Sequence, residues 1–308
     1  MSSRWLRIAG WVVAGVVGVL AIRALVRQWH ELLHQPVTWQ VRPLYLAGAA
    51  VMIFANYALL VQAWRVMLRG WRQHIGFRDS VRIWMLSNLG KYVPGKIWAV
   101  AGMAVMAQRQ GAAPWAATAS AVVLQALAVG TGAAVTGLAG SDRLVAAAPW
   151  TRFALIALIV GSIAGLALLL WPPITRRLLR VVRVSAPPEQ SPGVGPIAFG
   201  LGANVVAWIA YGVSLWLLGH GLFDVPGLTV RAAIGAFVAS YVSGLLALFA
   251  PGGIGVREFV FFVMLDGVVG PGLAAALAVA SRLLLTITEL GAALPFLLMQ
   301  RTTAGAAD

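Results

Sequence analysis

Long apolar runs separated by short polar segments dominate the chain. A membrane-spanning helix needs about 20 consecutive apolar residues. The runs near that length lie at 5–26, 43–64, 113–139, 153–171, 196–218, 230–249 and 273–299. Two stretches interrupt the pattern, because 80–110 contains "KYVPGK" and 250–270 contains "PGG". The pattern predicts an all-α polytopic membrane protein with about six full spans and two re-entrant broken-helix hairpins.

Composition supports this class. The chain is 60% hydrophobic and 10% charged, with a mean hydropathy of +0.86, which excludes a soluble globular protein. The net charge of +14 does not indicate a nucleic-acid partner, because most arginines lie between apolar runs, as in the cytoplasmic loops of membrane proteins. The absence of cysteine from the sequence excludes disulfides, thiolate metal sites and cysteine nucleophiles.

The ends and the middle of the chain suggest its organisation. The N-terminal run resembles a signal peptide, but no small-residue cleavage site precedes Arg23 and Arg27, so we expect a retained first span. Residues 172–195 form a linker that is basic at first and then rich in Pro, Gly and Ser. We expect this linker to be cytoplasmic and to separate a first membrane half, 1–171, from a second half, 196–308.

Loop charges predict how 80–110 is threaded. Arginines flank the first span, follow the second span and begin the linker, so these segments are expected in the cytoplasm. The loop 219–229 contains Asp224 and no Lys or Arg, so it is expected outside. An even number of crossings must separate two cytoplasmic segments, and 113–139 with 153–171 already supplies two. The stretch 80–110 is therefore predicted to re-enter and return to its own side.

The second half repeats this plan around its own break at 230–270. The separation from Pro94 to Gln125 is 31 positions, as is that from Pro251 to Arg282. If 230–268 also turns back, the halves are inverted repeats and both termini are cytoplasmic. The run 230–249 is also long enough to cross completely, which would place the C-terminus outside.

Broken helices at membrane depth are tolerated only where protein or a wet cavity satisfies their backbone groups. Each break also exposes a helix N-terminus, which attracts anions. The candidate substrate-binding residues at the two breaks are Lys91, Tyr92, Pro94, Gly95, Lys96, Pro251, Gly252, Gly253, Arg257 and Glu258. We expect no catalytic residue and no metal ligand among them.

The last span adds Arg282, Thr286 and Glu289, which share one helix face and should avoid lipid. The expected partners are Glu289 for Arg257, or Arg282 for Glu258. An alternative is that these charges form only an ionic clamp between the halves. In the span 196–218, Asn204, Trp208 and Tyr211 also share a face, which indicates either a packing seam or a site.

The segment from His30 to His34 reads "HELLH", the pattern of a zinc metalloprotease helix, and "LDG" at 265–267 resembles a further ligand motif. Pro36 soon ends that helix, and no Asn-Pro precedes "LDG". An intramembrane metalloprotease is therefore a remote alternative to an amphipathic segment beside the membrane.

The stretches "SNLGKYVPGKIW", "RQGAA" and "APGGIGVREF" resemble the membrane domain of the lysylphosphatidylglycerol synthase/flippase family over roughly residues 40–300. The resemblance implies a flippase-like protein of the bacterial inner membrane, with a cytoplasmic N-terminus, that moves a lipid headgroup between leaflets. It also implies phospholipid, polyprenyl or glycolipid substrates. No acyltransferase domain follows within the chain, so we expect no aminoacyl transfer.

The sequence therefore predicts a flippase or scramblase for a phosphate-bearing lipid, not an enzyme, and with no cofactor. No Walker-type phosphate loop occurs, so any energy is expected from a gradient or a downhill lipid flux. A different hypothesis is a non-catalytic accessory subunit of a lipid-modifying or glycolipid-synthesising enzyme. Either a homo-oligomer or a lipid-synthesising partner enzyme is compatible with the sequence.

Overall fold

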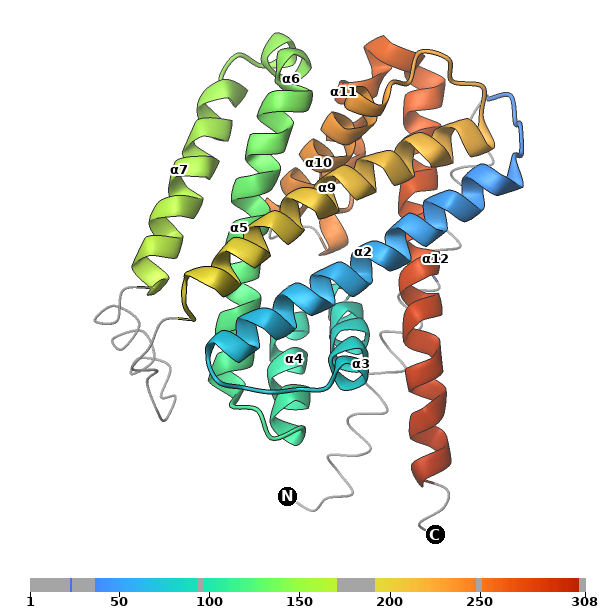
Figure 1. Ribbon diagram of the computed structural model, residues 1–308. Helices are drawn as coiled ribbons and strands as arrows, with labels where there is room; N and C mark the ends of the chain where they lie inside the picture. The colour runs from blue at the N-terminus through green and yellow to red at the C-terminus, as the bar shows by residue number, and fades with distance from the viewer. Residues whose placement is uncertain (1–22, 24–36, 93–96, 171–191, 248–250, 305–308) are drawn as a thin grey trace.

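The computed structural model describes residues 23, 37–92, 97–170, 192–247 and 251–304. These residues form helices and, within the described ranges, no strand (Figure 1). The predicted first span and most of the linker lie outside the described residues. The helices, in chain order, are α2 (Pro43–Gly70), α3 (Phe77–Asn88), η1 (Leu89–Tyr92), α4 (Ile97–Arg109), α5 (Pro114–Ala139), α6 (Ser141–Ala147), α7 (Thr151–Leu170), α9 (Val194–Leu222), α10 (Val230–Leu246), η2 (Pro251–Gly253), α11 (Val256–Val269) and α12 (Pro271–Ala304).

Four of the predicted spans are confirmed as long apolar helices. The candidate spans are α2, α5, α9 and α12, each with 26 or more residues. At 1.5 Å per residue, each is longer than the roughly 30 Å hydrocarbon core of a bilayer. The helix α7 also forms where a span was predicted, and its 20 residues extend about 30 Å. The protein is therefore an all-α polytopic membrane protein.

The first broken region folds back on itself, as predicted. The helices α3 and α4 have 12 and 13 residues, so each extends only about 18–20 Å and neither crosses a bilayer. They pack against each other, and their outer ends lie together at the bottom of Figure 1. The turn residues 93–96 lie outside the described part of the chain.

The second broken region also turns back, so the alternative of a complete crossing is wrong. The helices α10 and α11, of 17 and 14 residues, form a hairpin whose outer ends lie at the top of Figure 1. The helix α12 then runs from the top to the bottom. The hairpins enter from opposite ends, and η1 contacts η2 in the middle of the molecule.

Glycines allow the close backbone contacts at both breaks. Gly253 has a φ of +73°, and a Cβ there would lie 2.8 Å from the Cα of Gly244 on α10. A Cβ on Gly90 would lie 2.8 Å from the backbone nitrogen of Ala99 on α4. A larger residue at either position would push the broken segment away from its hairpin.

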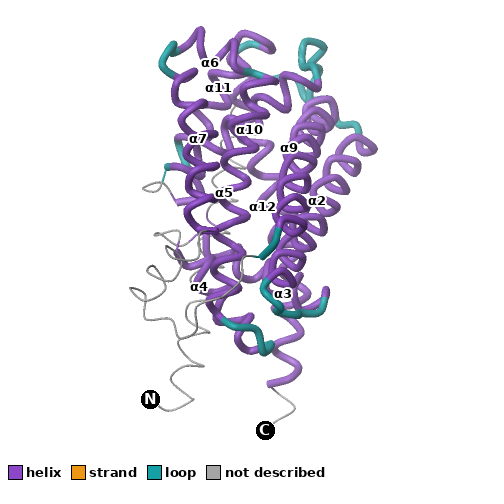
Figure 2. Tube along the Cα trace, turned by 60° about the vertical axis from the view of Figure 1, so that its left-hand side comes forward, coloured by secondary structure: helices purple, strands orange, loops and turns teal. Residues whose placement is uncertain are grey.

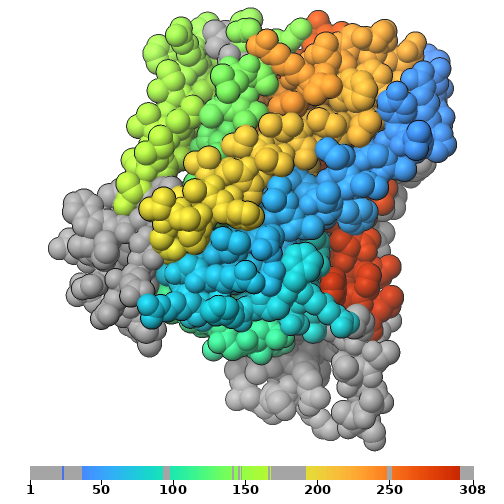
Figure 3. Space-filling view, in the orientation of Figure 1, coloured from blue at the N-terminus to red at the C-terminus, as the bar shows by residue number. Residues whose placement is uncertain are grey.

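The two halves are inverted repeats in which α2, α3, α4 and α5 correspond to α9, α10, α11 and α12. The helices α2 and α9 lie side by side and run in opposite directions (Figure 1 and Figure 2), and they form two diagonal bands across the front surface in Figure 3. The hairpin helix α3 packs against α12, and its equivalent α10 packs against α5. Each half therefore holds the hairpin of the other.

Two reciprocal hydrogen bonds between α2 and α9 also reflect the inverted repeat. The Asn56 side chain donates from Nδ2 to the Ala207 carbonyl oxygen at 3.2 Å, and the Ser214 hydroxyl donates to the Ala49 carbonyl oxygen at 2.9 Å. Asn56 and Ser214 are 158 positions apart, as are Ala49 and Ala207. This offset is one more than the 157 positions from Pro94 to Pro251, so the repeat extends from the breaks to the long helices.

Candidate functional site

A cavity of about 600 Å³ lies beside the first break. Residues from both halves line it, which follows from the exchange of hairpins between the halves. Its polar or aromatic lining residues are Tyr57, Trp84, Asn88, Lys91, Gln125, Ser162, Asn204, Trp208, Tyr211, Tyr241 and Glu289. The expectation that the broken helices line a cavity is thus confirmed for the first break.

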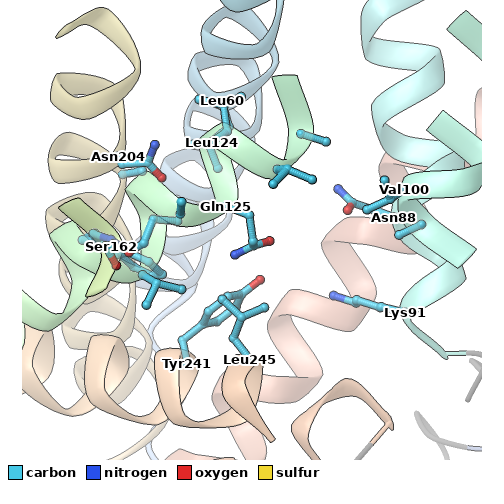
Figure 4. A pocket seen from close by; sticks show the side chains of 18 of the residues that line it. Leu60, Asn88, Lys91, Val100, Leu124, Gln125, Ser162, Asn204, Tyr241 and Leu245 are labelled. Carbon is cyan, nitrogen blue, oxygen red and sulfur yellow. Dashed lines mark hydrogen bonds between the residues drawn. The ribbon is translucent and has the colours of Figure 1, made fainter. Parts of the chain in front are cut away.

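Lys91 and Glu289 bring the first break and α12 together. Lys91, on η1, forms an ion pair with the Glu289 carboxylate through its Nζ atom. The adjacent Tyr92 hydroxyl donates to the other Glu289 oxygen, Oε2, at 3.0 Å. Figure 4 shows Lys91 pointing into the cavity, and its side chain stays 32% exposed. Lys91 thus has an internal counter-ion and also remains accessible to a ligand.

The second break is held by a different ion pair. Arg282, on α12, pairs with Glu258, on α11, which confirms one of the two predicted pairs. Arg282 also donates from Nη2 to the Gly252 carbonyl oxygen at 3.1 Å. The second Glu258 oxygen accepts a hydrogen bond from the Gly255 backbone N–H at 2.7 Å. The Glu258 carboxylate therefore already occupies the N-terminus of α11. This arrangement differs from the open anion site expected at that terminus.

Arg257 does not pair with Glu289, so the other predicted pair is wrong. Its guanidinium lies over the rings of Phe237 and Tyr241, with distances from Cζ to the ring centroids of 5.2 and 5.0 Å. Among the described residues, its Nη2 atom is buried and has no hydrogen-bond partner. Glu289 is already occupied by Lys91 and Tyr92, and the aromatic faces of α10 stabilise the cation instead.

The other predicted site residues are distributed as follows. Pro94, Gly95 and Lys96 lie outside the described residues, as does the "HELLH" segment. Pro251, Gly252 and Gly253 form η2, which lies against η1. The Thr286 hydroxyl donates to the Arg282 carbonyl oxygen of its own helix at 2.9 Å. Of the three described basic candidates, Lys91 lines the cavity, whereas Arg257 and Arg282 are not among its lining residues.

The shared face on α9 belongs to the cavity wall. Asn204, Trp208 and Tyr211 all line the cavity, and Trp208 Nε1 also donates to the Ala128 carbonyl oxygen at 3.2 Å. Asn204 Nδ2 donates within its own helix, to the Gly200 carbonyl oxygen at 2.8 Å. The face therefore serves both as packing surface and as cavity lining.

Sequence reasoning did not select Asn88, Tyr57 or Tyr241 as site residues. Asn88 belongs to the same "SNLGK" stretch as Lys91, so its position could have been inferred from the break. Tyr57 and Tyr241 lie in apolar helices without a motif, and only the packing of α2 and α10 brings them to the cavity. Gln125 stood out through its spacing alone, and it projects into the centre of the cavity in Figure 4.

Comparison with protein-family models assigns the chain to a family. The family model described as the lysylphosphatidylglycerol synthase TM region matches residues 7–291. The chain belongs to this family. The matched part contains both breaks and all the cavity-lining residues, from Tyr57 to Glu289.

Membership of this synthase TM-region family confirms the resemblance drawn from the two break motifs. It supports a lipid-related function for a membrane protein. Comparisons with curated proteins and with solved structures each found no match. The specific function must therefore be inferred from the cavity itself.

Proposed function

We propose that this protein is a lipid flippase or scramblase that moves the phosphate-bearing headgroup of a lipid between leaflets through the cavity at the first break. The observation that carries the proposal is Lys91, a cation that pairs with Glu289 and yet faces a cavity whose walls include the candidate spans α2, α5 and α9. The lipid tails stay in the bilayer while the headgroup occupies the cavity. The proposed step moves a lipid without making or breaking a covalent bond, so the proposed function is transport and not catalysis.

The volume suits a headgroup. A cavity of about 600 Å³ falls in the range of about 300–1,000 Å³ that is typical of small-molecule sites. Its walls combine a few polar groups with many apolar ones, among them Leu60, Val100 and Leu124 in Figure 4. A polar path with apolar walls lowers the cost of moving a charged group through hydrocarbon.

The charges favour an anion. A lysine ammonium has three N–H donors, and Glu289 takes one of them, so the others can donate to phosphate oxygens. Around both breaks, the described residues place Lys91, Arg257 and Arg282 against Glu258 and Glu289, which leaves one positive charge in excess. Glu289 keeps Lys91 from being a buried, unpaired cation when the site is empty. Its negative charge also weakens phosphate binding, which helps release.

Reconstitution of the purified protein into liposomes tests this proposal. Fluorescent phosphatidylglycerol is present in both leaflets of the liposomes, and an added reductant bleaches only the label in the outer leaflet. Lipid movement between the leaflets also exposes the inner label, so more than half of the total fluorescence is lost. We expect movement with the wild-type protein and a loss with Lys91→Gln. The matched control is Arg109→Gln, which removes an exposed cation outside the cavity.

Absence of lipid movement by folded wild-type protein would contradict the proposal. If the protein instead copurifies with a lipid-synthesising enzyme whose product disappears on deletion, the accessory-subunit hypothesis replaces it. Equal movement with wild-type protein and Lys91→Gln would mean that the transport path lies elsewhere.

A further inference from the structure

Besides the Ser162 hydroxyl, three hydrogen-bonding side chains project into the cavity without a hydrogen-bond partner among the described residues. They are the Asn88 and Gln125 amides and the Tyr241 hydroxyl, and none has a hydrogen bond within the part of the chain that the structure describes. In Figure 4, Gln125 lies near the tip of Tyr241, and Asn88 lies on the same wall as Lys91. Each comes from a different helix, α3, α5 or α10, so no single element explains their convergence.

Unpaired polar groups at membrane depth are costly, and these groups therefore need water or a ligand. An amide offers both an N–H donor and a carbonyl acceptor, and a tyrosine hydroxyl also donates and accepts. Phosphate oxygens mainly accept hydrogen bonds, and an ammonium group only donates them. Neither group can therefore pair with both the donors and the acceptors of these three side chains. Hydroxyl groups both donate and accept, and they match all three side chains.

An aromatic wall lies beside these polar groups. The Tyr211 ring stacks on Phe237 at 5.0 Å, and Trp208 packs edge-on against Tyr241 at 5.5 Å between ring centroids. Trp208, Tyr211 and Tyr241 all line the cavity. A wall of this kind offers apolar ring surface next to hydroxyls, which suits a polyol whose C–H groups lie between its hydroxyl groups.

The same cavity offers little to a cationic headgroup. Among its described lining residues, Glu289 is the one carboxylate, and its two oxygens already accept from Lys91 and Tyr92. An amine would therefore meet Lys91 as a like charge and would find no free acidic partner.

We infer that the transported headgroup is an uncharged polyol, such as glycerol, inositol or a sugar, joined to its lipid through phosphate. Lys91 recognises the phosphate, and Asn88, Gln125 and Tyr241 recognise the hydroxyls. This inference rests on the proposed function, since it names the class of lipid that the same site moves.

Native mass spectrometry of the full chain with lipids of identical acyl chains tests the inference. The probes are phosphatidylglycerol, phosphatidylinositol, phosphatidic acid, which has no polyol, and phosphatidylethanolamine, which carries an amine. We expect at least one of the two polyol lipids to be retained about tenfold more than phosphatidic acid or phosphatidylethanolamine, since neutral hydrogen bonds to the polyol are added. A polyprenyl phosphate with and without a sugar extends the series to another lipid source.

Variants identify the recognising groups. Asn88→Leu and Gln125→Leu are expected to remove most of the polyol preference and leave phosphatidic acid retention unchanged. Gln108→Leu, an exposed position on α4 outside the cavity, is the matched control. The wild-type series needs no variant, so it remains decisive if a substituted protein fails to fold.

Equal retention of phosphatidic acid and both polyol lipids, or a preference for phosphatidylethanolamine, would overturn the inference. Lipid movement in liposomes separates this failure from failure of the proposed function. Movement without polyol preference contradicts the inference alone, whereas polyol preference without movement contradicts transport alone.

Discussion

The two breaks have the same backbone plan and different chemistry. At the first break, Lys91 is 32% exposed and faces a cavity, whereas at the second break Arg282 is 11% exposed and is held by Glu258 and Gly252. The position in α5 that corresponds to Arg282 carries Gln125, a neutral amide that projects into the cavity. An inverted repeat therefore keeps its fold while one break faces a cavity, which we propose as the ligand site, and the other is held by an ion pair.

The largest effect is expected from breaking the clamp. Arg282→Gln leaves Glu258 without its cation, and loss of one partner of a fully buried pair costs about 3–5 kcal/mol. The effect here should be smaller, because Glu258 is 28% exposed. We expect a clear fall in the thermal unfolding midpoint and in the yield of monodisperse protein in detergent.

A double variant, Arg282→Met with Glu258→Leu, provides the control. Apolar replacement of both partners is often tolerated, so it should recover stability compared with Arg282→Gln. If Arg282→Gln is as stable as wild type, the second break is not a clamp.

At the first break, the main effect is expected on transport. Lys91→Gln with Glu289→Gln removes both charges together, so no buried charge is left unpaired. Loss of a charged hydrogen bond costs about 1.5–3 kcal/mol, and we expect lipid movement to slow roughly tenfold or more. Movement in liposomes and the unfolding midpoint are measured on the same preparation. Normal transport by this variant would contradict the role of Lys91.

A smaller effect, of opposite sign, is expected from Glu289→Gln alone. A carboxylate about 4 Å from a bound phosphate opposes it by about 1 kcal/mol at the dielectric constant of water, which is the lower bound for a hydrated cavity. Its removal should raise retention of phosphatidylglycerol about threefold to tenfold in native mass spectrometry. Asp142→Asn, which neutralises an exposed acid on α6, should leave retention unchanged. Lower retention in Glu289→Gln would show that the carboxylate acts mainly by positioning Lys91.

The smallest effect is expected outside the breaks. Replacement of both His30 and His34 by Ala should leave transport and stability unchanged, since the "HELLH" segment lacks a convincing third zinc ligand in the sequence. Metal analysis of the purified protein provides the second measurement. Stoichiometric zinc that disappears with these substitutions would revive the metalloprotease hypothesis.

Much of the fold could be predicted from local sequence. The lengths of the apolar runs predicted the long helices α2, α5, α9 and α12. The arginine-rich segments and the paired Pro-Gly breaks predicted the re-entrant hairpins. Whether 230–268 crosses or returns could not be decided, because α10 alone has 17 apolar-rich residues and approaches a span in length. The short helix α6 was also not predicted, since it lies in a loop without long periodicity.

The site was predictable only in part. The break motif selected Lys91 and Tyr92, and helical spacing put Arg282 and Glu289 on one face. Spacing could not assign partners, however, because pairing depends on how the hairpins cross α12. Arg257 therefore contacts Phe237 and Tyr241, and Lys91 takes Glu289. The cavity walls from α5, α9 and α10 depend on tertiary packing that no motif records.

The most direct measurement is the amount of lipid bound per folded molecule in Lys91→Gln and in Arg282→Gln. Both variants are purified as monodisperse protein, and native mass spectrometry counts their retained phosphatidylglycerol. If the first break holds the ligand and the second is a clamp, as we propose, Lys91→Gln should lose its lipid, and the folded fraction of Arg282→Gln should keep it. Lipid retained in Lys91→Gln and lost from folded Arg282→Gln would contradict this division of roles.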